Sequence, residues 1–230
     1  MNTATTQAGI RFAAAQRVNR SLTASLEKRA LTWMAMRAPR WLTSDQLTLL
    51  GFGAQIAAGA MYALSRFHSG ALIAVCVCVI LNWLGDSLDG TLARVRQQQR
   101  PRYGFYVDHM VDAFGSVALM SGLAYSGFLH WQVALAMLVA FLLLSCESYL
   151  ATYTISRFQL SQGVFGPTEI RILLIAGNLA ILHDPHAHLF GRTLLLMDVG
   201  GVIAAAGMLG MVVWTSIRHT VELYRAEPLS

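Results

Sequence analysis

Residues 71–94 read ALIAVCVCVILNWLGDSLDGTLAR, an apolar run that ends in two carboxylates, Asp86 and Asp89. A helix needs about 20 mostly apolar residues to cross the hydrocarbon core of a bilayer, and this run is long enough. The two acids are three positions apart, so a helix carries both on one face. The stretch therefore predicts a transmembrane helix over Ala71–Ala93 with an acidic face at its C-terminal end.

A second acidic pair begins the next apolar run. Asp108 and Asp112 are four positions apart and also share one helix face. A short loop joins the two runs, so we expect antiparallel neighbours whose four carboxylates converge at one membrane depth. An ionised carboxylate in a span costs on the order of 2.5–3.5 kcal/mol, so the cluster needs a counter-charge. Oxygen ligands suit Mg²⁺, Mn²⁺ or Ca²⁺, and the predicted counter-charge is a pair of divalent cations, Mg²⁺ or Mn²⁺.

The whole chain has the composition of a membrane protein. Hydrophobic residues make up 55% of the 230 residues and charged residues only 13%, against about 25% charged in a soluble domain. We expect an all-α integral membrane fold, divided into a tail with a surface helix (1–42), a catalytic membrane domain (43–220) and a C-terminal tail (221–230). Six candidate spans are Gln46–Ser65, Ala71–Ala93, Phe105–Phe128, Trp131–Thr154, Glu169–Leu182 and Thr193–Ile217.

The cations of the chain are distributed unevenly around these spans. Most of them precede the first span or follow the second, fourth and sixth spans. Cytoplasmic loops carry the excess of Arg and Lys, so both termini and the Arg94–Arg102 loop are predicted to face the cytoplasm. The expected location is the cytoplasmic membrane of a bacterium or archaeon.

A helix is also expected before the first span. Apolar residues recur there at helical spacing, namely Leu22, Leu26, Ala30, Trp33 and Met34. This pattern predicts an amphipathic helix on the cytoplasmic membrane surface, and the alternative is a helix packed on the bundle. Thr43 is expected to be the N-cap of the first span, with Asp45 in its first turn.

The residues around the acids suit a nucleotide. Gly90 and Gly104 leave room for a ligand, Ala93 is small, and Arg94 can reach a phosphate. Two metal ions stabilise both the attacking and the leaving oxygens of an in-line displacement at phosphorus. The pattern therefore predicts transfer of a substituted phosphate from a nucleotide-linked donor.

The run Asp86–Arg94, followed by Gly104, Asp108 and Asp112, resembles the CDP-alcohol phosphotransferase signature, D-x2-D-G-x2-A-R-x8-G-x3-D-x3-D. The segment Val95–Tyr103 is one residue longer than its counterpart in the signature. The resemblance implies a homodimer, CMP as leaving group, and Asp112 as the general base. It also implies metal ligands at Asp86, Asp89, Asp108 and Asp112, and CDP contacts at Asp86, Gly90, Ala93 and Arg94.

Two local features are similar to the choline/ethanolamine branch of that family. His109 follows Asp108, and Thr168-Glu169 precedes the fifth span. The resemblance favours transfer from CDP-choline or CDP-ethanolamine to diacylglycerol, and the alternative is transfer from CDP-diacylglycerol to a small polar alcohol. His109 is a candidate base near neutral pH, and Glu169 could orient it or share the proton. Alternatively, His109 hydrogen-bonds at the helix start and Glu169 only favours the helix dipole.

The acidic residues in the spans also allow other interpretations. Glu147 lies in the fourth span, where it could meet a head group or hydrogen-bond between helices. Intramembrane acids are also typical of divalent-cation or proton transporters, but these acids cluster at helix ends beside Arg94. A non-catalytic scaffold is a third reading. The expected partners are a CDP-linked donor, a lipid or small-alcohol acceptor and membrane lipids, but no nucleic acid.

Overall fold

The computed structural model describes residues 16–18, 24–155, 157–159, 166–189 and 191–227. Two pairs of short strands accompany the helices: β1 (Gln16–Val18) pairs in parallel with β2 (Arg157–Gln159), and β3 (His186–Leu189) pairs antiparallel with β4 (Arg192–Leu195). The helices of the described residues are α1 (Ala24–Arg37), α2 (Ser44–Ser65), α3 (Ala71–Val95), α4 (Pro101–Ser126), α5 (Trp131–Ile155), α6 (Pro167–His183) and α7 (Leu196–Ala226).

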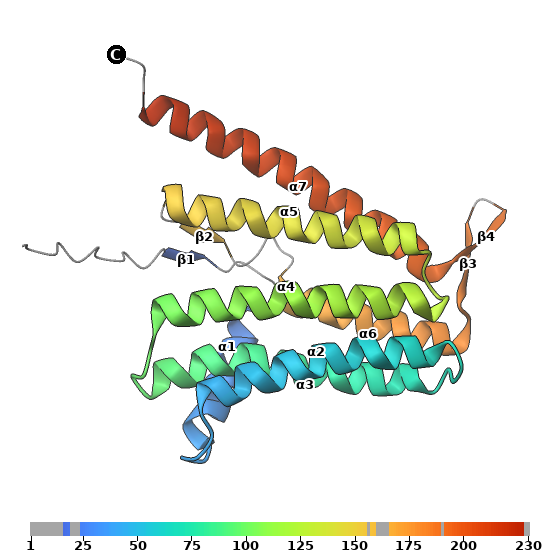
Figure 1. Cartoon of the computed structure of the whole chain (residues 1–230), viewed down its shortest axis with the longest axis horizontal. Coiled ribbons are helices and arrows are strands. Elements are labelled where there is room, and N and C mark those ends of the chain that lie inside the picture. Colours follow the sequence, from blue (N-terminus) through green and yellow to red (C-terminus); the bar gives the residue numbers. More distant parts are fainter. Residues whose placement is uncertain (1–15, 19–23, 156, 160–165, 190, 228–230) are drawn as a thin grey trace, which may run out of the picture.

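The long helices lie side by side, and the short α1 lies beside one end of α2 and α3 (Figure 1). Successive long helices run in opposite directions, so α2 and α4 begin at the end at which α3, α5 and α7 finish, and the shorter α6 begins nearer the middle of the bundle. We call the end at which α2 begins the basic end, because the Arg94–Arg102 loop lies there. The other end, where β3 and β4 form their hairpin, is called the opposite end.

Within the described residues, four helices are long and apolar enough to cross a membrane, namely α2, α3, α5 and α7. Helix α6 has only 17 residues, and α4 is long enough but carries polar residues along its length, Asp108 and Asp112 among them. The mostly helical membrane architecture is therefore confirmed. That α4 and α6 also cross the membrane, which would make six spans, remains a prediction.

Several predicted boundaries need correction. The last helix begins at Leu196 rather than Thr193, because Thr193 belongs to β4 and pairs with His188. It continues to Ala226, so the predicted domain boundary at 220 lies inside a helix. Helix α4 ends at Ser126 rather than Phe128, since Gly127 adopts a left-handed conformation with φ of 85°.

The segment before α2 contains the predicted helix, but the face that packs on the bundle is not the predicted apolar stripe. Leu31 and Ala35 are buried against Leu47, Leu88 and Leu92, whereas Leu26 and Trp33 are 73% and 55% exposed. Leu22 lies outside the described residues. Helix α1 therefore packs on the bundle with one face and leaves a second apolar face uncovered.

The start of α2 is as predicted. The Thr43 hydroxyl accepts a hydrogen bond from the backbone N–H of Gln46, and the Gln46 side chain accepts one from the Thr43 N–H. This reciprocal pair satisfies backbone donors that the helix leaves free, and Asp45 lies in the first turn. The exposed pair of Asp45 and Arg100 then links this turn to the residue before α4.

Glycines allow the closest helix contacts. A Cβ atom on Gly85 of α3 would lie 2.6 Å from the Leu47 carbonyl oxygen of α2. Farther along, a Cβ on Gly122 of α4 would overlap the Gly59 carbonyl of α2. These contacts bring both α3 and α4 close to α2. The core at the opposite end, which includes Tyr62 and Leu123, fills the space beyond them.

Candidate active site

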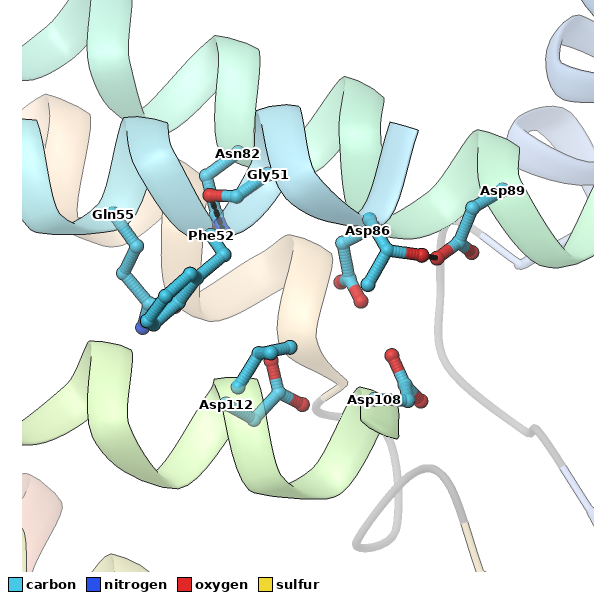
Figure 2. Close-up of a pocket in the computed structure, with 10 residues that line it drawn as sticks. Gly51, Phe52, Gln55, Asn82, Asp86, Asp89, Asp108 and Asp112 are labelled. Atoms are coloured by element: carbon cyan, nitrogen blue, oxygen red, sulfur yellow. Dashed lines mark hydrogen bonds between the residues drawn. The ribbon is translucent and has the colours of Figure 1, made fainter. Parts of the chain in front are cut away.

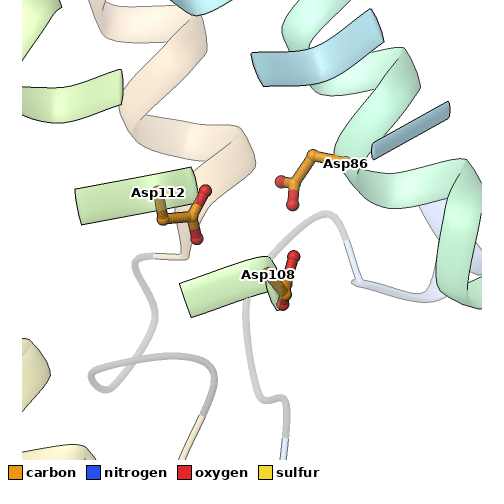
Figure 3. A group of neighbouring side chains, drawn as sticks. All are labelled: Asp86, Asp108 and Asp112. Carbon is orange, nitrogen blue, oxygen red and sulfur yellow. The ribbon is translucent and has the colours of Figure 1, made fainter. Parts of the chain in front are cut away.

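Three carboxylates converge between α3 and α4 near the basic end. Asp86 of α3 and Asp108 and Asp112 of α4 each offer an oxygen, and these oxygens lie within 4.8 Å of one another. Figure 3 shows the three side chains pointing toward a common point from the two helices. The spacing of the acids causes this, because residues three or four apart share a helix face. The convergence predicted from the sequence is thus present for these three.

The fourth predicted carboxylate, Asp89, lies one turn farther along α3 and lines the same pocket (Figure 2). It is only 9% exposed. Its Oδ2 accepts a hydrogen bond from the Thr48 hydroxyl at 2.5 Å, and its Oδ1 accepts one from the Gly90 backbone N–H. These bonds hold Asp89 beside the other three rather than among them.

A cation from α6 neutralises part of the cluster. Arg171 donates from Nη2 to Asp86 Oδ2 at 2.6 Å and from Nε to Asn82 Oδ1 at 2.9 Å. The Asn82 side chain donates in turn to the Gly51 carbonyl at 3.0 Å. The remaining Arg171 nitrogen, Nη1, is buried and makes no hydrogen bond to any described residue. A buried guanidinium N–H without a partner is costly, so this atom is suited to an anionic ligand.

The small residues predicted beside the acids leave open space. A Cβ on Gly90 would meet only the Arg94 guanidinium, at 3.4 Å, and a Cβ on Gly104 would meet nothing within 4 Å. Arg94 is exposed, and its Nη2 donates to the Thr91 hydroxyl at 2.9 Å. Ala93 is half-buried next to it. Gly90 and Arg94 therefore form an open, positively charged margin beside Asp89.

His109 lies next to the cluster but on another side of α4. Its ring packs against Phe105 and Tyr149, with centroids 4.1 Å and 4.7 Å away. Its Nδ1 donates to the Phe105 carbonyl at 2.6 Å, the helix-start hydrogen bond considered as the alternative role. Nδ1 also lies 3.9 Å from Asp108 Oδ2. The residues that line the pocket in the described chain do not include His109.

Glu169 is buried at the start of α6, where its Oε2 accepts a hydrogen bond from the Gly166 N–H at 2.9 Å. This contact caps the helix, and Glu169 lies in the first turn, the position given by the helix-dipole alternative. Glu147 of α5 pairs with His219 of α7 at 2.5 Å, and both side chains are largely buried. The pair joins two neighbouring helices, as the interhelical alternative for Glu147 predicted.

Three residues that contact the aspartates or line their pocket were not expected from the sequence: Thr48, Asn82 and Arg171. The signals for them were weak. Thr48 and Asn82 look like ordinary polar residues inside spans. Arg171 lies in the predicted span Glu169–Leu182, where an arginine is a functional candidate by default.

The donor set fits a hard divalent cation. All the converging atoms are carboxylate oxygens, which suit Mg²⁺ and Mn²⁺. The pocket has a volume of about 10 Å³, which is room for about one water-sized species. A nucleotide would therefore have to lie at the open side of the pocket.

Known proteins match the chain both in sequence and in fold. An archaetidylinositol phosphate synthase of Pyrococcus horikoshii is 26% identical over 121 residues, which cover 52% of this chain. The match spans 57% of that relative's length. Similar in fold is a crystal structure of the Mycobacterium tuberculosis phosphatidylinositol phosphate synthase with CDP-DAG bound. Its TM-score is 0.50 at 22% identity, over 87% of this chain and 92% of that one.

Neither match is a choline or ethanolamine phosphotransferase, so these matches do not support the prediction that the chain belongs to that branch. The broader assignment is firm. The model of the CDP-alcohol phosphatidyltransferases matches residues 41–216, a range that contains the four aspartates, Arg94 and Arg171. From this match over most of its length, we conclude that the chain belongs to the CDP-alcohol phosphatidyltransferase family.

Proposed function

We propose that the chain transfers a phosphatidyl group from CDP-diacylglycerol to a hydroxyl of a small polar alcohol and releases CMP. The observation that carries the proposal is the convergence of Asp86, Asp108 and Asp112 at the basic end. The choice of donor is supported by the CDP-DAG bound to the Mycobacterium tuberculosis protein. The choice of a small polar acceptor is supported by the names of both relatives, an archaetidylinositol phosphate synthase and a phosphatidylinositol phosphate synthase.

The four aspartates would hold two divalent cations. Asp86, Asp108 and Asp112 supply converging oxygens, and Asp89 lines the same pocket. When bound, the cations would neutralise the diphosphate and the charge that develops on the attacking and leaving oxygens. The Arg171 guanidinium already neutralises part of the charge of Asp86, so the protein keeps the acids together before a ligand arrives.

The reaction needs a base, and Asp112 is the carboxylate we assign to it. Asp112 takes the proton of the acceptor hydroxyl, whose oxygen then bonds to the β-phosphorus of the donor. The bond from that phosphorus to the bridging oxygen breaks, and CMP leaves with the bridging oxygen. Arg94 and the open backbone at Gly90 would contact the CDP portion.

The features that favoured the choline/ethanolamine branch have structural partners in this chain. His109 donates to a backbone carbonyl of its own helix. Thr168 donates to Glu27, and Glu169 caps α6. None of these contacts depends on a choline or ethanolamine head group. The CDP-choline or CDP-ethanolamine reaction is therefore retained as the alternative, with His109 and Glu169 as its candidate proton relay.

We further propose that the basic end faces the cytoplasm, because the excess of arginine lies there. The lipid donor would reach the acids from the bilayer, since they lie on helices that line up with the apolar spans. A homodimer is part of the same proposal and can be checked by cross-linking in membranes.

The test compares donors on one preparation. Purified protein with Mg²⁺ or Mn²⁺ is incubated separately with CDP-diacylglycerol, CDP-choline and CDP-ethanolamine, each with and without acceptors, and CMP is measured. We expect CMP release from CDP-diacylglycerol with inositol phosphate, glycerol phosphate or serine. Release only from CDP-choline or CDP-ethanolamine with diacylglycerol would establish the alternative branch. Cation flux in liposomes without CMP release would favour a transporter.

A further inference from the structure

One carboxylate oxygen outside the aspartate cluster collects three hydrogen bonds. Oε1 of Glu27, on α1, accepts from Trp83 Nε1 at 2.9 Å, from Ser87 Oγ at 3.2 Å and from Thr168 Oγ1 at 2.7 Å. Trp83 and Ser87 belong to α3, and Thr168 belongs to α6. Glu27 therefore joins α1 to α3 and α6 through a single atom.

These two helices are the ones that form the Asp86–Arg171 pair. Ser87 is the chain neighbour of Asp86 on α3. Thr168 lies three residues, about one turn, before Arg171 on α6. The Glu27 contacts thus fix the α3 turn that presents a candidate metal ligand and the α6 turn that presents its counter-charge.

The rest of α1 is also firmly attached to α3. Arg96, the C-cap residue of α3, donates to the backbone carbonyls of Ala38, Pro39 and Leu42, just after α1. Between the two polar attachments, Leu31 and Ala35 pack on Leu88 and Leu92. Helix α1 is therefore held at both ends by hydrogen bonds to the part of the bundle that carries the acids.

We propose that Glu27 is a positioning residue of the transfer site: by holding α3 and α6 in register, it sets Asp86 relative to Arg171. The inference rests on the proposed function, because its main readout is CMP release. Glu27 acts through Ser87 and Thr168 and does not line the acidic pocket. Its effect on the reaction is geometric, and small displacements of ligating or reacting groups are costly for catalysis.

Two substitutions separate the acceptor from the charge. In Glu27→Gln, the amide oxygen can still accept the three hydrogen bonds, so the register of α3 and α6 is kept. In Glu27→Ala, three donors lose their acceptor, and the polar link between α3 and α6 is gone. The matched control is Leu26→Ala, at the adjacent and 73% exposed position of the same helix.

The experiment measures kcat and KM for CDP-diacylglycerol, Mn²⁺ binding by electron paramagnetic resonance, and the thermal midpoint. For Glu27→Ala we expect kcat per folded enzyme to fall about tenfold or more with the donor KM little changed. We also expect Mn²⁺ to bind several-fold more weakly. Glu27→Gln should recover most of both losses, and Leu26→Ala should match the unaltered protein.

Three results would overturn the inference. One is an unaltered kcat and Mn²⁺ affinity in Glu27→Ala, and another is a lower thermal midpoint as its sole effect. The third is an equal loss in Glu27→Gln, which would assign the effect to charge. If Glu27→Ala does not fold, Ser87→Ala combined with Thr168→Val removes two of the three donors and must reproduce the loss of kcat and of Mn²⁺ affinity.

A control variant separates this inference from the proposed function. If Asp112→Asn still releases CMP at the normal rate, the assigned chemistry fails, whatever Glu27 does. If Asp112→Asn is inactive while Glu27→Ala behaves like the unaltered protein, the positioning role alone fails. Mn²⁺ binding is read without turnover, so it reports on Glu27 in either case.

Discussion

The two ends of the α2–α3–α4 group differ in how they are held together. Toward the opposite end, α4 meets α2 so closely that a Cβ on Gly122 would overlap the Gly59 carbonyl, and the space beyond is filled by Tyr62, Leu72 and Leu123. At the basic end, α3 and α4 present carboxylates to each other across a small pocket. Apolar packing fixes one end, and charged and polar groups hold the other.

This difference assigns separate tasks to the two ends. Backbone contacts at the glycines fix the helix positions without any ligand, because close packing resists displacement. The acids would repel one another if they were left uncompensated, so their end is stabilised by whatever positive charge it holds. Arg171 supplies part of that charge in the described structure. The basic end should therefore respond strongly to cations and the opposite end should not, and four experiments test the contrast.

The largest effect is expected for Asp112→Asn. This change removes the proposed base and a metal ligand but keeps the size of the side chain. We expect CMP release to fall about a thousandfold, in the range typical of a lost general base, while binding of CDP-diacylglycerol persists. The control is Asp184→Asn, an exposed carboxylate at the opposite end. A fully active Asp112→Asn enzyme would remove Asp112 as the base and leave His109 as the candidate.

Gly122→Ala tests the opposite end. The added methyl would collide with the Gly59 backbone, and overpacking of this kind costs about 1–3 kcal/mol. We expect a lower thermal midpoint in detergent, with kcat per folded enzyme much less affected than stability. Gly207→Ala is the matched control, because a Cβ there meets nothing within 4 Å and alanine favours a helix over glycine by about 0.5–1 kcal/mol. Equal midpoints for the two variants would contradict the close contact.

Arg171→Gln tests the counter-charge at the basic end. Removing a cation that pairs with Asp86 lowers the repulsion that an incoming divalent ion meets. We expect Mn²⁺ to bind about threefold or more tightly in a titration followed by electron paramagnetic resonance. Arg100→Gln, which removes an exposed arginine paired with Asp45, should change the affinity much less. Weaker binding in Arg171→Gln would mean that Arg171 mainly holds Asp86 in place.

The smallest effect is expected from Asp184, which lies beyond the end of α6. A hydrogen bond from the His186 backbone N–H lowers the pKa of its carboxyl below the usual value. A lowered pKa stabilises the folded state above the ordinary Asp value, about 3.9, and this gain is lost as the pH falls through the lowered pKa. Asp184→Ala should therefore show a slightly reduced thermal midpoint at neutral pH and no difference in strong acid. A deficit that persists in acid would exclude this carboxylate as its cause.

Much of the basic end could be predicted from the sequence because its determinants are local. The spacing of Asp86, Asp89, Asp108 and Asp112 sets which helix faces they occupy, and the short loop makes the helices neighbours. The cap at Thr43 follows from its own residue type and that of Gln46. The long apolar runs gave helices whose ends differ from the expected ones by a few residues.

The remaining features depend on contacts between distant segments. Glu27 and Thr168 are 141 positions apart, and no local pattern indicates that they meet. The same holds for Arg171, whose partner depends on how α6 packs on α3. In α1, apolar residues lie on more than one face, and the predicted stripe with Leu26 and Trp33 does not include Leu31 and Ala35. The structure places Leu31 and Ala35 there.

The crossing of Gly59 and Gly122 has a mechanical consequence for the far end of α4. Asp108 lies 14 residues from Gly122, about 21 Å along the helix axis. If α4 tilts by about 3° around that crossing, the Asp108 backbone moves by about 1 Å. A displacement of this size can lower the rate of an enzyme about a hundredfold. Helices change tilt when the thickness of the surrounding bilayer changes. The rate of CMP release would then depend on the thickness of the membrane that the protein occupies.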